Sequence, residues 1–358
     1  MKATAELHEL GQSLWLDNIT RTMLRDGTLA GYIEELSVTG LTSNPTIFDK
    51  AISGGDAYDE QIAELSSELD SAEEIFFQLA LADLRDATEL FQQVHERTAG
   101  VDGFCSLEVS PKLADDTQGT IEQAARLHGE GDRPNLFVKI PGTRPGLPAI
   151  EESIFAGIPI NVTLLFSREH YLAAADAYMR GIERRIEAGL DPDVASVASI
   201  FMSRWDVAVA DEAPAELRNR LGLAVGFRAY RAYRELLESN RMQRLMNEGA
   251  RPQRLLWAST GTKDPDASDV LYIEGFASPF TVNTMPEPTL KAFADHGQVG
   301  DPVPADGGDS EQVLARFGAA GVDVEALAER LQDEGAQAFV GSWNELLKTI
   351  EAQLGARA

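Results

Sequence analysis

Short apolar runs alternate along this chain with longer stretches in which apolar residues recur every three or four positions. The short runs are rich in Val, Ile, Leu and Phe, and Gly, Pro and Asn residues bound them, which is typical of buried strands. We predict strands at residues 13–19, 38–45, 103–110, 135–141, 158–166, 194–202 and 255–260. Two runs compete for the eighth strand, 270–276 and 280–284, and we prefer the second.

The periodic stretches between these runs predict helices. They cover residues 6–12, 20–27, 31–36, 46–52, 59–69, 71–96, 117–128, 147–156, 168–188 and 217–238. Ser71 is a suitable N-cap for the helix that follows it. Strands that alternate with helices at this spacing predict a parallel sheet with crossover helices. Eight such units favour an α/β fold with a closed (β/α)₈ TIM-type barrel over an open sheet.

The region after the eighth strand has a different pattern. Residues 300–308 are rich in Pro, Gly and Asp and predict a loop, and amphipathic helices are expected at 310–317, 323–334 and 343–354. Asp323 is a good N-cap for the second of these helices. We expect the helices to pack across the barrel, so that residues 1–358 form one domain with a barrel at about 13–295 and a helical tail at about 309–355.

Composition and charge narrow the class of protein. Hydrophobic residues make up 44% of the chain, as in ordinary globular proteins, and no apolar run approaches the ~18 residues of a membrane helix. The first residues lack the apolar segment of a secretory signal, and the single cysteine, Cys105, rules out an intramolecular disulfide. These features predict a cytoplasmic protein.

The formal net charge is −27, from 58 acidic and 31 basic residues. Such a charge disfavours nucleic acid and anionic membranes as partners. A phosphate-bearing substrate would therefore need a local group of Arg or Lys side chains. The five histidines form neither a His-x-His nor a His-Glu-x-x-His pattern, so a zinc or non-haem iron site is not expected.

One lysine interrupts the apolar run NLFVKIP at residues 135–141. Placing an ammonium group among apolar side chains costs free energy unless the group is paired or loses its proton. Desolvation lowers the pKa of a lysine, and a neutral amine is what Schiff-base chemistry requires. Lys139 is thus either a structural ion-pair partner at the strand end or a reactive nucleophile, and the run alone favours the structural interpretation.

Other polar residues favour the second interpretation. In a barrel, the carboxyl ends of the strands share one face, where active sites are built. The polar residues at the predicted strand ends, or in the loops directly after them, are Asp17, Thr42, Asn44, Glu108, Lys139, Asn161, Thr163, Ser199, Arg204 and Lys263. A solvated rim would explain any single member of this set, but it explains a lysine, two carboxylates, amides and hydroxyls together less well.

These residue types suit the cleavage of a carbon–carbon bond through an iminium ion. A lysine amine attacks a ketone, and a carboxylate such as Asp17 takes the proton from the hydroxyl next to the bond that breaks. A second carboxylate, such as Glu108, could move protons through a water held by Thr163 as the imine forms. Asn44 and Asn161 could bind hydroxyls of a polyol, although either could equally be a turn residue.

Five segments resemble the transaldolase family. They are WLDNITR at 15–21, TGLTSNPT at 39–46, LEVS at 107–110, VKIPGT at 138–143 and NVTL at 161–164. The resemblance runs from about residue 14 to about 284, and the tail resembles that of the longer bacterial transaldolases. It implies class I aldolase chemistry without cofactor or metal, in which a dihydroxyacetone unit passes from sedoheptulose 7-phosphate to glyceraldehyde 3-phosphate. The products would be erythrose 4-phosphate and fructose 6-phosphate, as in the non-oxidative pentose phosphate pathway.

The resemblance also implies a role for each candidate residue. Lys139 matches the family's Schiff-base lysine, Asp17 its general acid and base, and Glu108 with Thr163 its water-holding pair. Asn44, Asn161 and Ser199 match residues that bind the dihydroxyacetone hydroxyls, and Thr42 belongs to the same substrate-binding set. By analogy with the family, the chain would be a monomer or a homodimer.

The phosphate site departs from the family's pattern. Arg204 matches one phosphate-binding arginine, but the stretch ASTGTK at 258–263 lacks the second. We expect Lys263 to supply that charge, as a point charge and not a bidentate fork, helped by backbone N–H groups near Gly261. The alternative is that Lys263 is a solvated loop residue.

Two other functions remain open at this point. The first is a related aldolase that acts on fructose 6-phosphate and releases free dihydroxyacetone, although family members with that activity are much shorter. The second is a catalytically silent barrel that only binds sugar phosphates, which the presence of Asp17, Glu108 and Lys139 disfavours. Dependence on an acceptor aldehyde would distinguish a transferase from the first, and trapping of a lysine adduct would distinguish it from the second.

Overall fold

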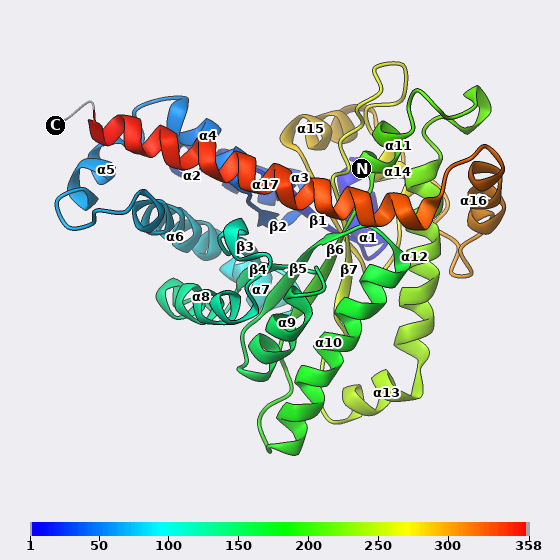
Figure 1. The fold of residues 1–358 in the computed structure, drawn as a ribbon, viewed down its shortest axis with the longest axis horizontal. Coiled ribbons are helices and arrows are strands. Elements are labelled where there is room, and N and C mark those ends of the chain that lie inside the picture. Colours follow the sequence, from blue (N-terminus) through cyan, green and yellow to red (C-terminus); the bar gives the residue numbers. More distant parts are fainter. Residues whose placement is uncertain (1, 356–358) are drawn as a thin grey trace.

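Eight parallel strands close into a barrel in the order of the chain, as the computed structural model shows for residues 2–355, which it describes (Figure 1). The strands are β1 Ser13–Asp17, β2 Val38–Thr42, β3 Cys105–Glu108, β4 Leu136–Pro141, β5 Ile160–Leu165, β6 Ser196–Phe201, β7 Arg254–Ala258 and β8 Val282–Met285. Strand β1 pairs with β8 from Ser13 opposite Val282 to Leu16 opposite Met285, which closes the ring. The predicted (β/α)₈ barrel is confirmed.

Helices surround the barrel. Before β5 they are α1 Ala3–Glu9, α2 Arg21–Arg25, α3 Thr28–Leu36, α4 Pro45–Ser53, α5 Asp59–Leu65, α6 Ala72–Leu90, α7 Gln92–Arg97, α8 Thr117–Gly131 and α9 Gly146–Phe155, with a 3₁₀ turn, η1, at Pro111–Leu113. Between β5 and β8 they are α10 Arg168–Glu187, α11 Ser203–Ala208, α12 Leu221–Glu238, α13 Asn240–Asn247 and α14 Leu271–Gly275, with η2 at Ala215–Leu217. The remaining helices are α15 Glu287–His296, α16 Ser310–Ala319 and α17 Val324–Gly355.

Alternation along each strand separates outward from inward side chains, and the position along the strand decides whether an inward side chain is apolar or polar. Residues of one parity point outward and form the cluster between strands and helices, for example Val138 and Ile140 of β4. Residues of the other parity point into the barrel, where Phe137 stacks on Phe104 with ring centroids 4.1 Å apart. Two positions after Phe137, the same parity brings Lys139 to the carboxyl end of the barrel. The amino-terminal half is thus filled with apolar side chains and the carboxyl half carries the chemistry.

Several predicted elements differ from those observed. Residues 270–276, the rejected candidate for the eighth strand, contain the short helix α14. The predicted helix at 71–96 is divided near Phe91 into α6 and α7, and Ser71 caps the first by accepting a hydrogen bond from the Glu74 N–H. Helices α11, α13 and α15 were not predicted, because they are short or follow directly on other elements.

The largest correction concerns the tail. We predicted separate helices at 323–334 and 343–354, but α17 is one continuous helix of 32 residues. Gly335, which lies between the two predicted helices, is a point of close approach, since a Cβ there would lie 3.0 Å from both Leu164 and Arg204 side-chain atoms. A glycine therefore lets the helix lie directly on the barrel.

Helix α17 crosses the molecule as a long diagonal from α16 to α4 and α5 (Figure 1). It is held by polar and apolar contacts: Gln332 donates a hydrogen bond of 2.8 Å to the Leu164 carbonyl, and Trp343 packs edge-on against Phe76 with centroids 5.0 Å apart. Since Leu164 is the penultimate residue of β5, the helix covers the carboxyl end of the barrel. Across residues 2–355, none of the helices has both the length and the apolar character needed to cross a bilayer.

Candidate active site

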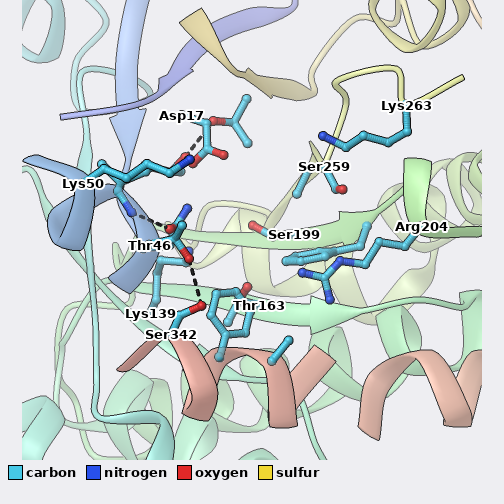
Figure 2. A pocket seen from close by; sticks show the side chains of 18 residues that line it. Asp17, Thr46, Lys50, Lys139, Thr163, Ser199, Arg204, Ser259, Lys263 and Ser342 are labelled. Atoms are coloured by element: carbon cyan, nitrogen blue, oxygen red, sulfur yellow. Dashed lines mark hydrogen bonds between the residues drawn. The ribbon is translucent and has the colours of Figure 1, made fainter. Parts of the chain in front are cut away.

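A cavity of about 370 Å³ opens at the carboxyl end of the barrel, beneath α17. Figure 2 shows side chains from opposite sides of the barrel pointing into it. The cavity brings together most of the residues that the sequence singled out, namely Asp17, Thr42, Asn44, Lys139, Thr163, Ser199, Arg204 and Lys263. The other two candidates, Glu108 and Asn161, do not line it but contact residues that do.

Lys139 lies at the bottom of this cavity with only 6% of its surface exposed. Strand register places it opposite Glu108 on β3 and Asn161 on β5. Its Nζ donates a hydrogen bond of 3.1 Å to the Ser43 carbonyl and lies 3.5 Å from Glu108 Oε2. The amine is therefore buried, directed into the cavity and next to a carboxyl group, as a nucleophile toward a carbonyl must be.

The Asp17 carboxyl group, at the end of β1, also lines the cavity. Its Oδ1 accepts a hydrogen bond of 2.9 Å from the Thr42 hydroxyl, which in turn lies 2.7 Å from the Thr284 hydroxyl. Burial raises the pKa of Asp17, while the charge of Lys139, the Thr42 hydrogen bond and the charge of Lys263 lower it in part. A carboxyl with a raised pKa is suited to take a proton and return it.

Glu108 is buried beside Lys139, and burial raises its pKa against the opposing charge of Lys139. Neither oxygen of Glu108 forms a hydrogen bond with any group in residues 2–355, and the same is true of the Thr163 hydroxyl. Both side chains thus keep hydrogen-bonding capacity, although buried polar atoms are normally paired. A protonated Glu108 beside the amine can act as an acid toward an oxygen leaving the carbon that the amine has attacked.

Amide and hydroxyl groups form a second network. Ser199 donates a hydrogen bond of 2.7 Å to Asn161 Oδ1, and Asn161 donates one of 3.1 Å to the Ser106 hydroxyl. Asn44 caps α4, because its Oδ1 accepts a hydrogen bond of 3.1 Å from the Ile47 N–H. Since the cap uses only the oxygen, the Asn44 amide nitrogen remains able to donate to a bound hydroxyl.

The positive charges gather on the β6 and β7 side of the cavity. Arg204 follows β6, and its guanidinium carbon lies 5.0 Å from the Phe201 ring centroid and 6.0 Å from that of Phe339. Lys263 lies in the loop after β7, and Figure 2 shows it on the same side as Arg204. Neither forms an ion pair within residues 2–355, and burial lowers the pKa of Arg204. Uncompensated cations in a cavity suit a phosphate group.

Several lining residues were missed by the sequence analysis. They are Thr46, Ile47, Lys50, Phe201, Ala258, Ser259, Thr284, Ala338, Phe339 and Ser342. Thr284 follows Val282 by two residues on the predicted eighth strand, so the strand-end rule could have found it. Lys50 comes from the second turn of α4 and Phe339 and Ser342 come from α17, and no local signal in the sequence indicates that these helix faces meet the cavity.

Comparisons with known proteins show the family of this chain. A family model described as Transaldolase/Fructose-6-phosphate aldolase matches residues 14–350. The chain is 46% identical to the curated transaldolase of Parafrankia sp. (strain EAN1pec), over 100% of this chain and 99% of that protein. It is also 46% identical to the transaldolases of Frankia alni, over 98% and 97% of the two chains, and of Thermobifida fusca, over 98% of each.

Proposed function

The chain belongs to the transaldolase/fructose-6-phosphate aldolase family and is a transaldolase, and from this premise we propose that Lys139 carries the substrate as a Schiff base. A transaldolase moves a dihydroxyacetone unit from sedoheptulose 7-phosphate to glyceraldehyde 3-phosphate. The observation that best supports this role is the buried Lys139 amine, which points into the cavity 3.5 Å from the Glu108 carboxyl. The remaining roles follow from what surrounds that amine.

Imine formation needs one proton donor. The Lys139 amine attacks C2 of the ketose, and the resulting carbinolamine loses its oxygen as water when that oxygen receives a proton. Glu108 supports this step because burial favours its protonated form. The Thr163 hydroxyl, which lacks a hydrogen-bond partner in the described chain, is suited to hold the water that relays the proton.

Bond cleavage needs one proton acceptor. The Asp17 carboxylate takes the proton from the C4 hydroxyl, the C3–C4 bond breaks, and its electron pair enters the iminium to give an enamine on Lys139. Erythrose 4-phosphate leaves as an aldehyde. The enamine then attacks the aldehyde carbon of glyceraldehyde 3-phosphate, Asp17 returns its proton to the new alkoxide, and hydrolysis of the imine releases fructose 6-phosphate.

Recognition is divided between the two sides of the cavity. Asn44 and Ser199 are suited to bind hydroxyls of the dihydroxyacetone unit, Asn161 supports them through its hydrogen bond from Ser199, and Thr42 holds Asp17 in place. Arg204 and Lys263 are suited to bind the phosphate at the far end of the sugar. Their position allows a local positive site in a protein whose formal net charge is −27.

Reductive trapping tests the assignment of Lys139. Incubation with fructose 6-phosphate and borohydride should yield a reduced three-carbon adduct on the peptide that contains Lys139, detected by mass spectrometry. Lys139→Ala should give none, and Lys348→Met, which changes the same charge on the exposed face of α17, should give the wild-type amount. An adduct that persists at the full level in Lys139→Ala would contradict the assignment.

The same experiment separates imine formation from cleavage. Asp17→Ala should still trap the intact ketose on Lys139, because imine formation does not use the cleavage base. Its turnover should fall by about 10²–10⁴-fold, the usual contribution of general base catalysis. Near wild-type turnover would show that Asp17 is not the base.

Dependence on an acceptor tests the transfer itself. Fructose 6-phosphate alone should yield little free dihydroxyacetone, and an aldose phosphate should accelerate turnover strongly. Release of dihydroxyacetone at a rate independent of acceptor would identify a fructose 6-phosphate aldolase instead.

We further propose that residues 1–358 act as one domain and that the protein is a monomer or a homodimer. We also propose that it works in the cytoplasm, and the single cysteine supports this location, because such a chain needs no oxidising compartment.

A further inference from the structure

Lys50 lines the active-site cavity from a helix to which the reaction gives no role. It lies in the second turn of α4, and Figure 2 shows its side chain extending from that helix toward the cavity that holds Lys139. The backbone of α4 is fixed at its start by the Asn44 cap and along its length by contacts with α17. The structure therefore presents this exposed lysine to the same space as the substrate.

The charge of Lys50 is not neutralised by its own helix. Asp49 is the only acidic residue of α4, and its Oδ1 accepts a hydrogen bond of 2.7 Å from the Thr349 hydroxyl of α17. Lys50 itself forms no ion pair or hydrogen bond with any side chain in residues 2–355. Within the described chain, Lys50 therefore lines the cavity as a cation without a carboxylate partner, as Arg204 and Lys263 do.

Two hydroxyl groups line the same cavity as this lysine. The Thr46 hydroxyl, one turn earlier on α4, donates a hydrogen bond of 2.9 Å to the Ser342 hydroxyl of α17, and both residues line the cavity. Because Ser342 accepts this bond, its own proton is available to another acceptor. The lysine and the serine together offer a cation and a hydroxyl donor, the groups that commonly bind a phosphate.

The closed ring places Lys50 across the cavity from the other two cations. Lys50 follows β2 and Arg204 follows β6, and strands four positions apart in a ring of eight lie on opposite sides. Figure 2 shows Lys50 on one side and Arg204 with Lys263 on the other. In the strand order, β4, which carries Lys139, lies between β2 and β6. The cavity thus has two separate cationic ends.

We infer that Lys50 and Ser342 form a second anion subsite, which binds a phosphate on C1 of a ketose. This inference rests on the proposed function: when C2 meets Lys139 and the distal phosphate lies on Arg204 and Lys263, C1 points toward the β2 side of the barrel. The ligand class is a ketose bisphosphate, with one phosphate at each end of the cavity. Such a compound competes with the monophosphate donor for the free enzyme.

Inhibition by a ketose bisphosphate tests the subsite. Fructose 1,6-bisphosphate should inhibit transfer from fructose 6-phosphate to an aldose phosphate acceptor, competitively with the donor. Lys50→Met should raise the inhibition constant about fivefold, as expected for one exposed charge pair, and should change the KM of fructose 6-phosphate by less than twofold. Lys348→Met, which removes an exposed charge of α17 outside the cavity, should leave the inhibition constant unchanged.

The outcomes distinguish the two proposals. Turnover without inhibition by the bisphosphate, or equal inhibition of wild type and Lys50→Met, would overturn the subsite and leave the transaldolase mechanism intact. If the wild-type enzyme failed to trap substrate on Lys139, the mechanism would fail. Calorimetric titration of wild type and Lys50→Met with fructose 1,6-bisphosphate would then still test the subsite by the same fivefold difference. At high salt, the difference in bisphosphate affinity between wild type and Lys50→Met should be smaller, because salt screens the charge of the exposed Lys50.

Discussion

The hydroxyl groups behind Asp17 lower the pKa of its carboxyl group against the effect of burial. Thr42 donates its proton to Asp17, so Thr284 must supply the proton in the bond between the two threonines. This arrangement stabilises the carboxylate, whereas burial stabilises the protonated acid, and burial has the larger effect on the pKa. As the pH falls, Asp17 therefore becomes protonated at a higher pH than an exposed aspartate would.

Thr42→Val should move this limit to higher pH. The proposed base works only as the carboxylate, so activity should fall as pH decreases through its pKa, which already lies above the ordinary value of 3.8. Removing the hydroxyl removes one group that lowers the pKa, and the acidic limb of the kcat profile should shift upward. Thr39→Val serves as the control, because the Thr39 hydroxyl donates to the Leu14 carbonyl and Thr39 does not line the cavity. An unchanged acidic limb would show that another group limits the rate.

Strand-end residues could be predicted from the sequence because two regular rules place them. Parallel strands of a barrel end on one face, and alternation decides which side chains point inward. Those rules placed Lys139 and Asp17 in one cavity without knowledge of any long-range contact. Lys50 and Ser342 depend on how α4 packs against α17, which only the full set of tertiary contacts determines, and so they could not be found.

At the scale of elements, the continuity of α17 matters for the phosphate end of the cavity. Gly335 and Phe339 lie one turn apart on this helix, the first in close contact with Arg204 and the second with its ring facing the guanidinium. The sequence predicts two helices, at 323–334 and 343–354, but residues 335–342 between them, which include Gly335 and Gly341, continue the helix. Helix propensity is a weak guide where tertiary contacts oppose it.

Phe339→Ala should therefore weaken phosphate binding without affecting the chemistry. Phe339 and Phe201 both stack near Arg204, and a cation–π contact contributes about 0.5–2 kcal/mol. We expect the KM for glyceraldehyde 3-phosphate to rise about threefold with unchanged kcat, and the KM for unphosphorylated glyceraldehyde to stay constant. Phe339→Tyr should restore the KM, and Val340→Ala on the same helix should not change it. Equal losses with both acceptors would indicate a general loss of structure instead.

At the scale of the whole molecule, the chain combines a local positive site with a strongly negative surface. Many surface charges are already paired, for example Arg241 with Glu183 at 2.7 Å, but an excess of 27 negative charges remains. This excess acts over the whole surface and opposes the compact state. The cations of the cavity act only over short distances. Salt therefore affects the stability of the fold through surface repulsion, and substrate binding through the cavity cations, as two separate effects.

Added salt should consequently stabilise the folded protein. Raising potassium chloride from about 0.01 to about 0.15 M shortens the Debye length from about 30 to about 8 Å, which screens repulsion between distant carboxylates more than it weakens close ion pairs. The midpoint of thermal unfolding at pH 7 should rise by about 2 °C or more, as measured by calorimetry or circular dichroism. At a pH nearer the sequence pI of about 4.5, the same addition should have a smaller effect, because protonation has already reduced the net charge. A midpoint that falls with salt at pH 7 would mean that surface ion pairs outweigh the repulsion.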